Sequence, residues 1–519
     1  MAPEGDRKGF FYSLLSAALL LLAQPPFQFI LLPFLALTPL AVALGQPSRR
    51  PAWYGLLFGL FYWGVLLLWV PLEVGPRFSW AFPGYMAQVG LLSGLSALMA
   101  WCAHRLRAVK GLPLYLAFPL AWVGMEWLKA HFSFGLAFPW LGLGMTLTAW
   151  PEFLGLAEWT GEAGVAFWLA LVNGLLAMAF LDGSREREFE GEMGEFPGPQ
   201  GPARRLRWIS LAALVGVGPA FLGLLRARTL PTHPGPRVAV VGTGVPASLR
   251  LKPVEGTQEA LREAREMLQT LPAGAVDLAV LPEAVVGLPL EDEGARIFRR
   301  ELAGVARSLR APLLFGALGG SGGDPRLLPT NSAFLMDSLG ILRGRYDKVR
   351  LVPGMEWGGY RAGEPGQVLE VDGMRLGPLI CYESIFGSLA RMYGQSGAVL
   401  LVNLTSDVWF GGPEAWPGRG FLAQHPSHLV MRAVETRTGV ARAANGGLSL
   451  LLDPLGKALT EPLPPGPGMA LATVPVVQGS TLFSRTGDLV GPACVIFLLV
   501  LLLPRPWSRR GAPGRPKVP

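Results

Sequence analysis

The stretch GPLICYES, residues 377–384, places a cysteine at the end of a short apolar run. The chain has three cysteines, and the other two, Cys102 and Cys494, lie in long apolar stretches. Cys381 therefore has no nearby partner for a disulfide. Cys381 ends an apparent strand and lies close in sequence to the carboxylate of Glu383. Its role has to be inferred from the surrounding sequence.

Strand-like and helix-like segments alternate on both sides of this stretch. The segments expected to form strands are 237–245, 277–286, 311–318, 373–384, 398–407, 448–454 and 470–476. The amphipathic segments expected to form helices are 257–271, 295–309, 388–397 and 427–439. Residues 331–352 are expected to form a β-hairpin that turns near 338–340. Apolar strands alternating with helices predict an α/β fold whose sheets are covered by helices.

The rest of the chain has a different composition. The whole chain is 51% hydrophobic and only 16% charged, whereas soluble domains carry about 25% charged residues. Charge-free runs cover residues 10–48, 51–72, 78–103, 111–125, 132–151, 163–181, 208–225 and 489–504. This pattern predicts a polytopic membrane protein with one large extramembrane domain.

Eight membrane spans are expected from these runs. They are 10–24, 28–44, 54–72, 84–103, 112–128, 163–181, 208–225 and 489–504. The first run is too long for a signal peptide. With eight spans and a cytoplasmic N-terminus, seventeen Lys and Arg residues fall inside and two fall in short outside loops, as the positive-inside rule prefers. Residues 132–151 are then an interfacial or re-entrant segment, and the soluble domain lies outside the cytoplasm.

This topology predicts three parts of the chain. Residues 1–228 form the membrane domain, with a cytoplasmic linker at 182–207. Residues 229–482 form the extracytoplasmic domain, and residues 483–519 form span 8 and a cytoplasmic tail. The net charge of +8 does not predict nucleic-acid binding, because much of the excess lies in short loops between apolar runs.

Three polar residues of the soluble domain follow predicted strands. They are Glu283, Lys348 and Cys381, and strand ends are where α/β folds collect reactive groups. Each has an ordinary structural interpretation: a turn carboxylate, a solvated lysine and a small buried thiol. Individually the three signals are weak, and only their joint spacing is specific.

In this order and spacing, LPEAVV (281–286), DKVRLVPGMEW (347–357) and LICYESIF (379–386) resemble the Glu–Lys–Cys triad segments of the nitrilase superfamily. Two later segments, LVNLTSDVWFGG and RAVETRTGVARAANGG, are similar to that superfamily as well. Eight spans around an extracytoplasmic domain of this kind resemble the apolipoprotein N-acyltransferase family. The chain departs from the family pattern at Leu281, where Trp is usual, in the turn 242–246, and at Leu251, where a Trp is common.

The resemblance implies an αββα sandwich and a function. The expected activity is transfer of a fatty acyl chain from a phospholipid to the α-amino group of an N-terminal diacylglyceryl-cysteine of an apolipoprotein. Cys381 is the expected nucleophile that forms a thioester, Glu283 the base, and Lys348 the cation that stabilises the oxyanion. Glu356, Tyr382 and Glu383 are expected to support them. For Glu383, a helix-terminal carboxylate is a nearly equal alternative.

Two Gly- and Pro-rich segments, 354–366 and 409–421, are expected to form mobile loops beside the membrane. Their aromatic residues are candidates for contact with acyl chains, since Trp and Tyr favour the bilayer interface: Trp357, Tyr360, Trp409, Phe410 and Trp416. No metal or cofactor is expected. His425 and His428 lack a completing acidic or cysteine ligand, so a scaffold role or contact with substrate is expected for them instead. No phosphate-binding glycine motif is present.

Two other interpretations stay open at this point. One is a membrane-anchored amidase of the nitrilase type that uses water as the acceptor. The other is a transporter with a degenerate soluble domain, although Glu126 is the only clear acidic residue within a predicted span. We expect a monomer in the cytoplasmic (inner) membrane, with its catalytic domain on the periplasmic side.

Overall fold

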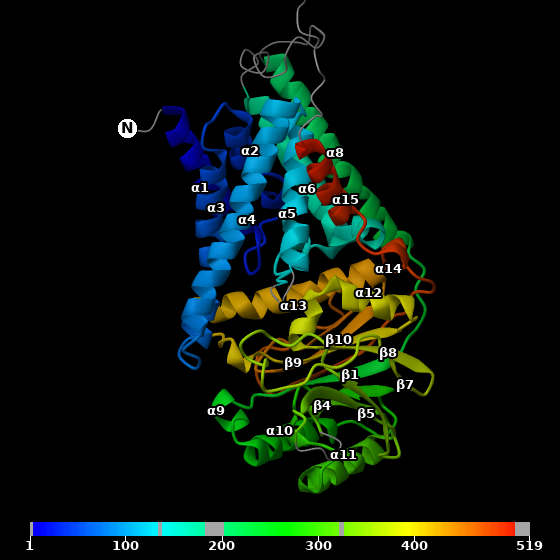
Figure 1. The fold of residues 1–519 in the computed structure, drawn as a ribbon. Coiled ribbons are helices and arrows are strands. Elements are labelled where there is room, and N and C mark those ends of the chain that lie inside the picture. Colours follow the sequence, from blue (N-terminus) through cyan, green and yellow to red (C-terminus); the bar gives the residue numbers. More distant parts are fainter. Residues whose placement is uncertain (1–3, 133–136, 182–201, 321–325, 504–519) are drawn as a thin grey trace, which may run out of the picture.

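The computed structural model describes residues 4–132, 137–181, 202–320 and 326–503. A bundle of helices stands on one side of a two-sheet domain (Figure 1). The bundle helices are α1 (Glu4–Ala23), α2 (Thr38–Gly45), α3 (Pro51–Leu66), α4 (Ala81–Lys110), α5 (Leu114–His131), α6 (Ala157–Phe180), α8 (Pro202–Thr229) and α15 (Val490–Leu502). The C-terminal α15 packs mainly against α5, so it completes the bundle formed by the earlier helices.

Each predicted apolar stretch contains helix, but the expected count of eight spans is not confirmed. Among the described residues, four helical segments are long and apolar enough to cross a membrane: Pro51–Val74, Ala81–Lys110, Pro151–Phe180 and Pro202–Thr229. Leu32–Gly45 and Val490–Leu502 are apolar but shorter. At about 1.5 Å per residue they fall short of the roughly 30 Å hydrocarbon core of a bilayer. Helix α5 carries Glu126 and Lys129 in its second half.

The ambiguous run 132–151 is not a ninth spanning helix in its described part. Residues 137–142 have no helix, and Leu143–Leu147 form a short 3-10 turn that is fully buried. The segment folds back on α5, because Lys129 Nζ donates to the Trp140 carbonyl (2.8 Å) and the Leu143 N–H donates to Glu126 Oε1 (2.7 Å). Residues 133–136 lie outside the described residues.

Two boundaries of the predicted membrane domain fall partly outside the described chain. Residues 182–201 of the predicted linker are not described, whereas residues 202–207 belong to α8, so the linker prediction extended too far. The predicted C-terminal tail, from residue 504 on, is also outside the described residues.

The soluble domain contains two mixed sheets. The larger has the order β12-β1-β2-β4-β5-β6, with β3 paired to β4. Its strands are β1 (Arg237–Gly242), β2 (Leu278–Val280), β3 (Val286–Pro289), β4 (Leu313–Gly319), β5 (Thr330–Met336), β6 (Leu342–Asp347) and β12 (Gly468–Thr473). The smaller has the order β11-β10-β9-β8-β7. Its strands are β7 (Leu369–Val371), β8 (Met374–Ile380), β9 (Leu400–Ser406), β10 (Gly439–Asn445) and β11 (Leu450–Leu452).

Side-chain alternation along the strands gives the large sheet two buried faces. Ala239 and Val241 of β1 pack in a core with α10 (Pro253–Leu268) and α11 (Arg296–Leu309). Val238 and Val240 face the opposite way, into the core that also contains the second sheet. Helices α12 (Gly387–Gln395) and α13 (Trp416–Thr436) contact the second sheet from its outer side. Helix layers therefore enclose two sheets, and α13 lies directly beneath the membrane bundle (Figure 1).

Helix α13 corrects one prediction from the sequence. It begins at Trp416, eleven residues before the expected start, so residues 416–421 of the predicted loop 409–421 are helical. The segment contains Pro417, Gly418 and Gly420, which resemble a loop in composition. Proline at the first turn of a helix is compatible with helical geometry because the amide N–H there has no partner within the helix.

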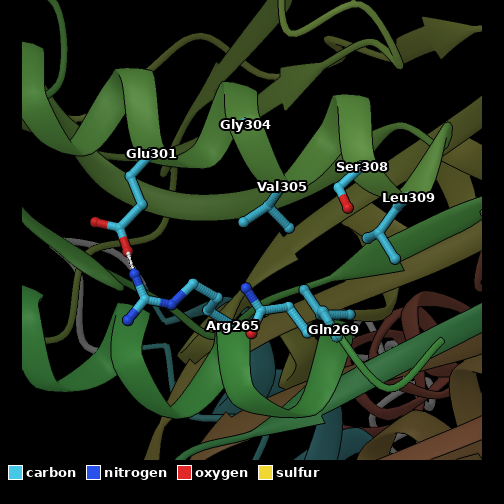
Figure 2. Close-up of a pocket in the computed structure, with 8 residues that line it drawn as sticks. Arg265, Gln269, Glu301, Gly304, Val305, Ser308 and Leu309 are labelled. Carbon is cyan, nitrogen blue, oxygen red and sulfur yellow. Dashed lines mark hydrogen bonds and ion pairs between the residues drawn. The ribbon is translucent and has the colours of Figure 1, made fainter.

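Helices α10 and α11 lie on the side of the domain far from the membrane bundle (Figure 1). They run side by side and are joined by an ion pair between Arg265 and Glu301 (2.8 Å). Figure 2 shows the shallow pocket between them, with Val305 and Leu309 along one wall. None of the predicted site residues lines this pocket.

Candidate active site

Glu283, Lys348 and Cys381 come from three strand ends. Glu283 follows β2, Lys348 follows β6 and Cys381 follows β8. The three side chains are buried, with exposed fractions of 7%, 1% and 5% for the whole residues. Because β5 and β8 of the two sheets contact each other, residues that are distant in sequence meet between the sheets.

The Lys348 ammonium lies between two carboxylates. Its Nζ is 2.9 Å from Glu356 Oε1 and 3.3 Å from Glu283 Oε1. The Asn331 side chain of β5 donates to the same two oxygens, at 2.7 Å to Glu283 and 2.8 Å to Glu356. Asn331 was not singled out from the sequence, where its only signal is an amide at the start of an apolar strand.

The electrostatics of the cluster oppose ionisation of the thiol and favour the lysine cation. Burial alone would lower the pKa of Lys348, but Glu283 and Glu356 outweigh it and hold the pKa well above its ordinary value. Burial raises the pKa of Cys381, and the charge of Glu283 raises it further. The resting thiol is therefore neutral at physiological pH, and a nearby proton acceptor is needed to ionise it.

Cys381 stands at a sharp change of backbone direction. Its φ is +51°, in the left-handed region that non-glycine residues seldom adopt. Strand β8 ends at Ile380, and a 3-10 turn, Cys381–Ile385, begins at the cysteine. The neighbouring Glu383 accepts a hydrogen bond from the Ile380 N–H (2.7 Å) and so caps this turn.

Glu383 also joins the cysteine turn to the lysine. Its Oε1 accepts from Tyr346 Oη (2.8 Å) and from the N–H groups of Val349 (2.7 Å) and Arg350 (3.1 Å). These residues flank Lys348 at the end of β6. Glu383 thus lies at the start of the cysteine turn and also contacts the strand end that carries Lys348.

A second buried network lies beneath Cys381 and includes His425 of α13. His425 Nε2 is 3.2 Å from the Cys381 carbonyl oxygen, and its Nδ1 is 3.0 Å from Asp407 Oδ1. Arg442 donates to the other oxygen of Asp407 (2.6 Å), and the Thr405 hydroxyl donates to Asp407 Oδ1 (3.0 Å). Sequence reasoning missed Asp407 and Arg442. For His425 it set aside a metal site and favoured a scaffold role or contact with substrate.

The remaining predicted residues occupy different environments. Tyr382 Oη donates to the Ala137 carbonyl of the membrane part (3.3 Å). Trp357 and Trp416 are exposed, and Tyr360 and Trp409 are half-buried. Phe410 is instead buried in an aromatic cluster with Trp69 of the membrane part and Phe421 of α13, at ring-centroid distances of 5.7 and 4.6 Å.

Ion pairs join α13 to the membrane helix α6. Arg432 lies 3.0 Å from Glu162 and 3.2 Å from Glu435, and Glu435 Oε1 accepts from the Glu162 N–H (2.9 Å). Just beyond α13, Arg437 pairs with Glu158 (2.7 Å). The helix that supports the cysteine carbonyl is therefore fixed to the membrane bundle.

Comparison with known proteins places both parts of the chain. Residues 16–175 match the family described as the apolipoprotein N-acyltransferase N-terminal domain, and residues 237–480 match the carbon-nitrogen hydrolase family. The apolipoprotein N-acyltransferase of Ralstonia nicotianae is 30% identical, over 94% of this chain and 91% of the relative. The chain belongs to the apolipoprotein N-acyltransferase family.

Other apolipoprotein N-acyltransferases align over similar lengths. The enzyme of Geobacter metallireducens is 29% identical over 94% of both chains. Among solved structures, an amidase from Nesterenkonia sp. is 24% identical, covers 50% of this chain and 95% of its own, and has a TM-score of 0.37. In the present chain, the segment that matches the carbon-nitrogen hydrolase family includes Glu283, Lys348 and Cys381.

Within the described residues, no three His, Cys, Asp or Glu side chains are grouped so that they could hold a metal ion. His428, the other histidine of QHPSH, is fully buried beside Trp140, with a ring-centroid distance of 5.2 Å.

Proposed function

We propose that this protein transfers a fatty acyl chain from a phospholipid to the α-amino group of the N-terminal S-diacylglyceryl-cysteine of apolipoproteins. Membership of the apolipoprotein N-acyltransferase family supports the reaction class. The observation that supports the mechanism is the buried cluster in which Lys348 contacts both Glu283 and Glu356. Glu383 joins the strand end that carries Lys348 to the Cys381 turn. In this proposal Glu283, Lys348 and Cys381 are the catalytic residues.

In the first half-reaction, the Cys381 sulfur attacks the ester carbonyl of the phospholipid. Glu283 accepts the thiol proton, and the ester carbonyl becomes a tetrahedral oxyanion next to Lys348. When the oxyanion collapses, the carbon–oxygen ester bond breaks and the lysophospholipid alkoxide takes up the proton from Glu283. The acyl chain then remains on Cys381 as a thioester.

In the second half-reaction, the α-amine of the diacylated acceptor attacks the thioester. Glu283 now accepts the amine proton, and the Cys381 thiolate leaves and is reprotonated. Lys348, whose pKa is held well above its ordinary value, stays cationic in both steps. Because both substrates use one sulfur, the lysophospholipid must leave before the amine reacts, which requires ping-pong kinetics.

Supporting roles follow from the contacts described above. Glu356 holds Lys348 in place, Glu383 fixes the cysteine turn against the lysine strand, and Tyr382 links that turn to the membrane part. The exposed or half-buried residues Trp357, Tyr360, Trp409 and Trp416 are proposed to meet lipid. Phe410 is proposed to meet the same acyl chains from within the aromatic cluster.

The proposed location is the cytoplasmic (inner) membrane, with residues 229–482 on the periplasmic side, residues 1–228 as the membrane domain, and residues 483–519 as a last span and tail. The asymmetry of Lys and Arg between loops supports this orientation. A reporter fused after residue 240 should behave as extracytoplasmic, and one fused at residue 195 or 512 as cytoplasmic. A cytoplasmic signal at 240 would contradict the orientation.

The test of the activity offers phospholipid with a labelled acyl chain together with a synthetic diacylated lipopeptide. The expected product is the triacylated lipopeptide, with lysophospholipid formed in equal amount. Release of labelled free fatty acid without labelled lipopeptide would replace the proposal by a hydrolase that uses water as the acceptor.

A further inference from the structure

A small apolar pocket lies at the junction of the membrane bundle and α13. It is formed by the end of α1 and the turn after it, the end of α3 and residues just beyond it, and the first turns of α13. Its volume is about 70 Å³. Its lining includes Leu21, Phe27, Leu68, Trp69, Gly420 and Gln424. We call it the junction pocket.

One polar group in the lining has no partner. Trp69 is only 7% exposed, yet its indole N–H donates to no acceptor within the described chain. Four other buried or half-buried tryptophans of the membrane part do donate: Trp63 to Ser96, Trp122 to Glu126, Trp140 to Gln424, and Trp168 to the Val215 carbonyl. A buried N–H without an acceptor is costly, and each one calls for an explanation.

The junction pocket is connected to the nucleophile through packed rings. The Trp69 ring contacts Phe421 (4.8 Å between centroids), and Phe421 contacts His425 (5.3 Å). His425 in turn lies against the Cys381 carbonyl. A molecule in the pocket is therefore held beside the helix that supports the reactive sulfur.

We propose that the junction pocket binds part of one acyl chain of the donor phospholipid, with an ester carbonyl of that lipid accepting the Trp69 N–H. The inference rests on the proposed function and names where its donor is held. No lining residue carries a charge, so neither a phosphate group nor an ammonium group is the part bound there. An ester carbonyl at the head of an aliphatic chain supplies both an acceptor and an apolar body.

The pocket is much smaller than the roughly 300–1,000 Å³ of sites that enclose drug-sized ligands, so it fits part of one acyl chain of any diacyl lipid. Abundance favours the donor over the diacylated acceptor. The junction pocket lies among the ends of membrane helices. In a bilayer, phospholipid is present in great excess over any lipoprotein. By mass action, the bulk lipid fills such a site.

Glycine 420 provides a way to fill the pocket without disturbing its walls. A Cβ added there would meet only Gln424 Nε2, at 3.7 Å, which is ordinary contact. Gly420→Ala should therefore be tolerated, whereas Gly420→Leu should occupy the pocket. Gly94 is an exposed glycine of α4 with no atom within 4 Å of an added Cβ, so Gly94→Leu is a matched control outside the site.

The experiment uses full-length Cys381→Ala protein in nanodiscs, with a phospholipid that carries a diazirine in one acyl chain. This readout needs no turnover, so it is separate from the activity test above. After irradiation, the crosslinked peptides are mapped by mass spectrometry. The expected result is crosslinking concentrated at residues 21–27 and 416–424, and competed by unlabelled phospholipid.

In the same background, Gly420→Leu should reduce these crosslinks at least about tenfold, and Trp69→Phe, which removes one hydrogen bond, roughly two- to tenfold. Gly420→Ala and Gly94→Leu should retain them. Crosslinks spread evenly over the lipid-facing helices, and unchanged by Gly420→Leu, would overturn the inference. Crosslinks removed by a diacylated lipopeptide but not by phospholipid would assign the pocket to the acceptor and overturn the donor assignment. If the triacylated product fails to form while these crosslinks behave as expected, the proposed function fails and the lipid site stands.

Discussion

Two buried clusters in this molecule have the same ionic composition and different surroundings. In the catalytic domain, Lys348 lies between Glu283 and Glu356. At the junction with the membrane bundle, Arg432 lies between Glu162 and Glu435. In each cluster one cation is shared by two carboxylates, but only the first has a thiol beside it.

The choice of cation shows what each cluster is suited to do. Lysine is a compact point charge that can approach a developing oxyanion, whereas the planar guanidinium of arginine suits fixed contacts to several carboxylates. The first cluster sits between sheets at the end of three strands, and the second ties a membrane helix to α13. We therefore expect the same charges to support chemistry in one place and attachment in the other.

The largest loss of activity is expected when the proposed proton acceptor of the first cluster is removed. Glu283→Gln should reduce acyl transfer by roughly 10²- to 10⁴-fold, the usual contribution of a general base. The substitution also removes a charge that raises the pKa of Cys381, so alkylation of the thiol by iodoacetamide at alkaline pH should not fall. Equal losses in alkylation and transfer would show that Glu283 merely keeps the site folded.

The cations can be exchanged to sharpen the comparison. Lys348→Arg should reduce kcat by about 10²- to 10³-fold, because a bulkier guanidinium in a site only 1% exposed displaces the charge from the oxyanion. Arg432→Lys is the matched change in the second cluster. It should keep most of kcat and lower the free energy of unfolding by about 1–3 kcal/mol. A severe loss of kcat in Arg432→Lys would contradict the division of roles.

Substitution of His425 tests whether the contact of α13 with the Cys381 carbonyl affects the rate of the reaction at Cys381. His425→Ala removes the contact to the Cys381 carbonyl and leaves Asp407 without one of its partners, and we expect kcat to fall about tenfold or more. His425→Gln keeps a donor near the carbonyl and should restore part of the rate. The measurement is the rate of thioester formation at saturating phospholipid. If both variants lose equally, the histidine serves only packing.

The smallest expected effect concerns pH and the second cluster. Burial raises the pKa of Glu435 to about 7, and the charge of Glu162 adds to the rise. The unfolded carboxyl ionises near its ordinary value, so the folded state loses stability as pH rises from about 4.5 to 7, by up to about 3 kcal/mol. In nanodiscs, the melting temperature of the wild type should fall between pH 5 and pH 8 by more than that of Glu435→Gln. Parallel pH profiles would contradict this.

The predictability of the two regions from sequence also differs. Glu283, Lys348 and Cys381 each sit in a short motif at a strand end, so they could be found from local sequence. Asn331 could not, because its contact with both carboxylates depends on the pairing of β5 with β6 and on the turn after β2. Asp407 and His425 meet Cys381 only through the packing of α13 on the second sheet.

In the described membrane region, each predicted span contains helix, but composition did not determine how many helices cross the bilayer. Run length alone does not distinguish a span from a short apolar helix such as α2, which ends at Gly45 after eight residues. The early start of α13 was missed for a related reason. Pro417 and Gly420 favour a loop locally, and burial of Phe421 against Trp69 outweighs that preference.

The most direct test of the central claim is to mix the purified protein with phospholipid alone and measure the mass of the peptide that contains Cys381. The account predicts an increase of one acyl group on this peptide, removable by hydroxylamine and absent in Cys381→Ser. Addition of the diacylated lipopeptide should then discharge it into triacylated product. If product forms with both substrates present while no acyl group ever appears on Cys381, transfer is direct and the thioester mechanism is wrong.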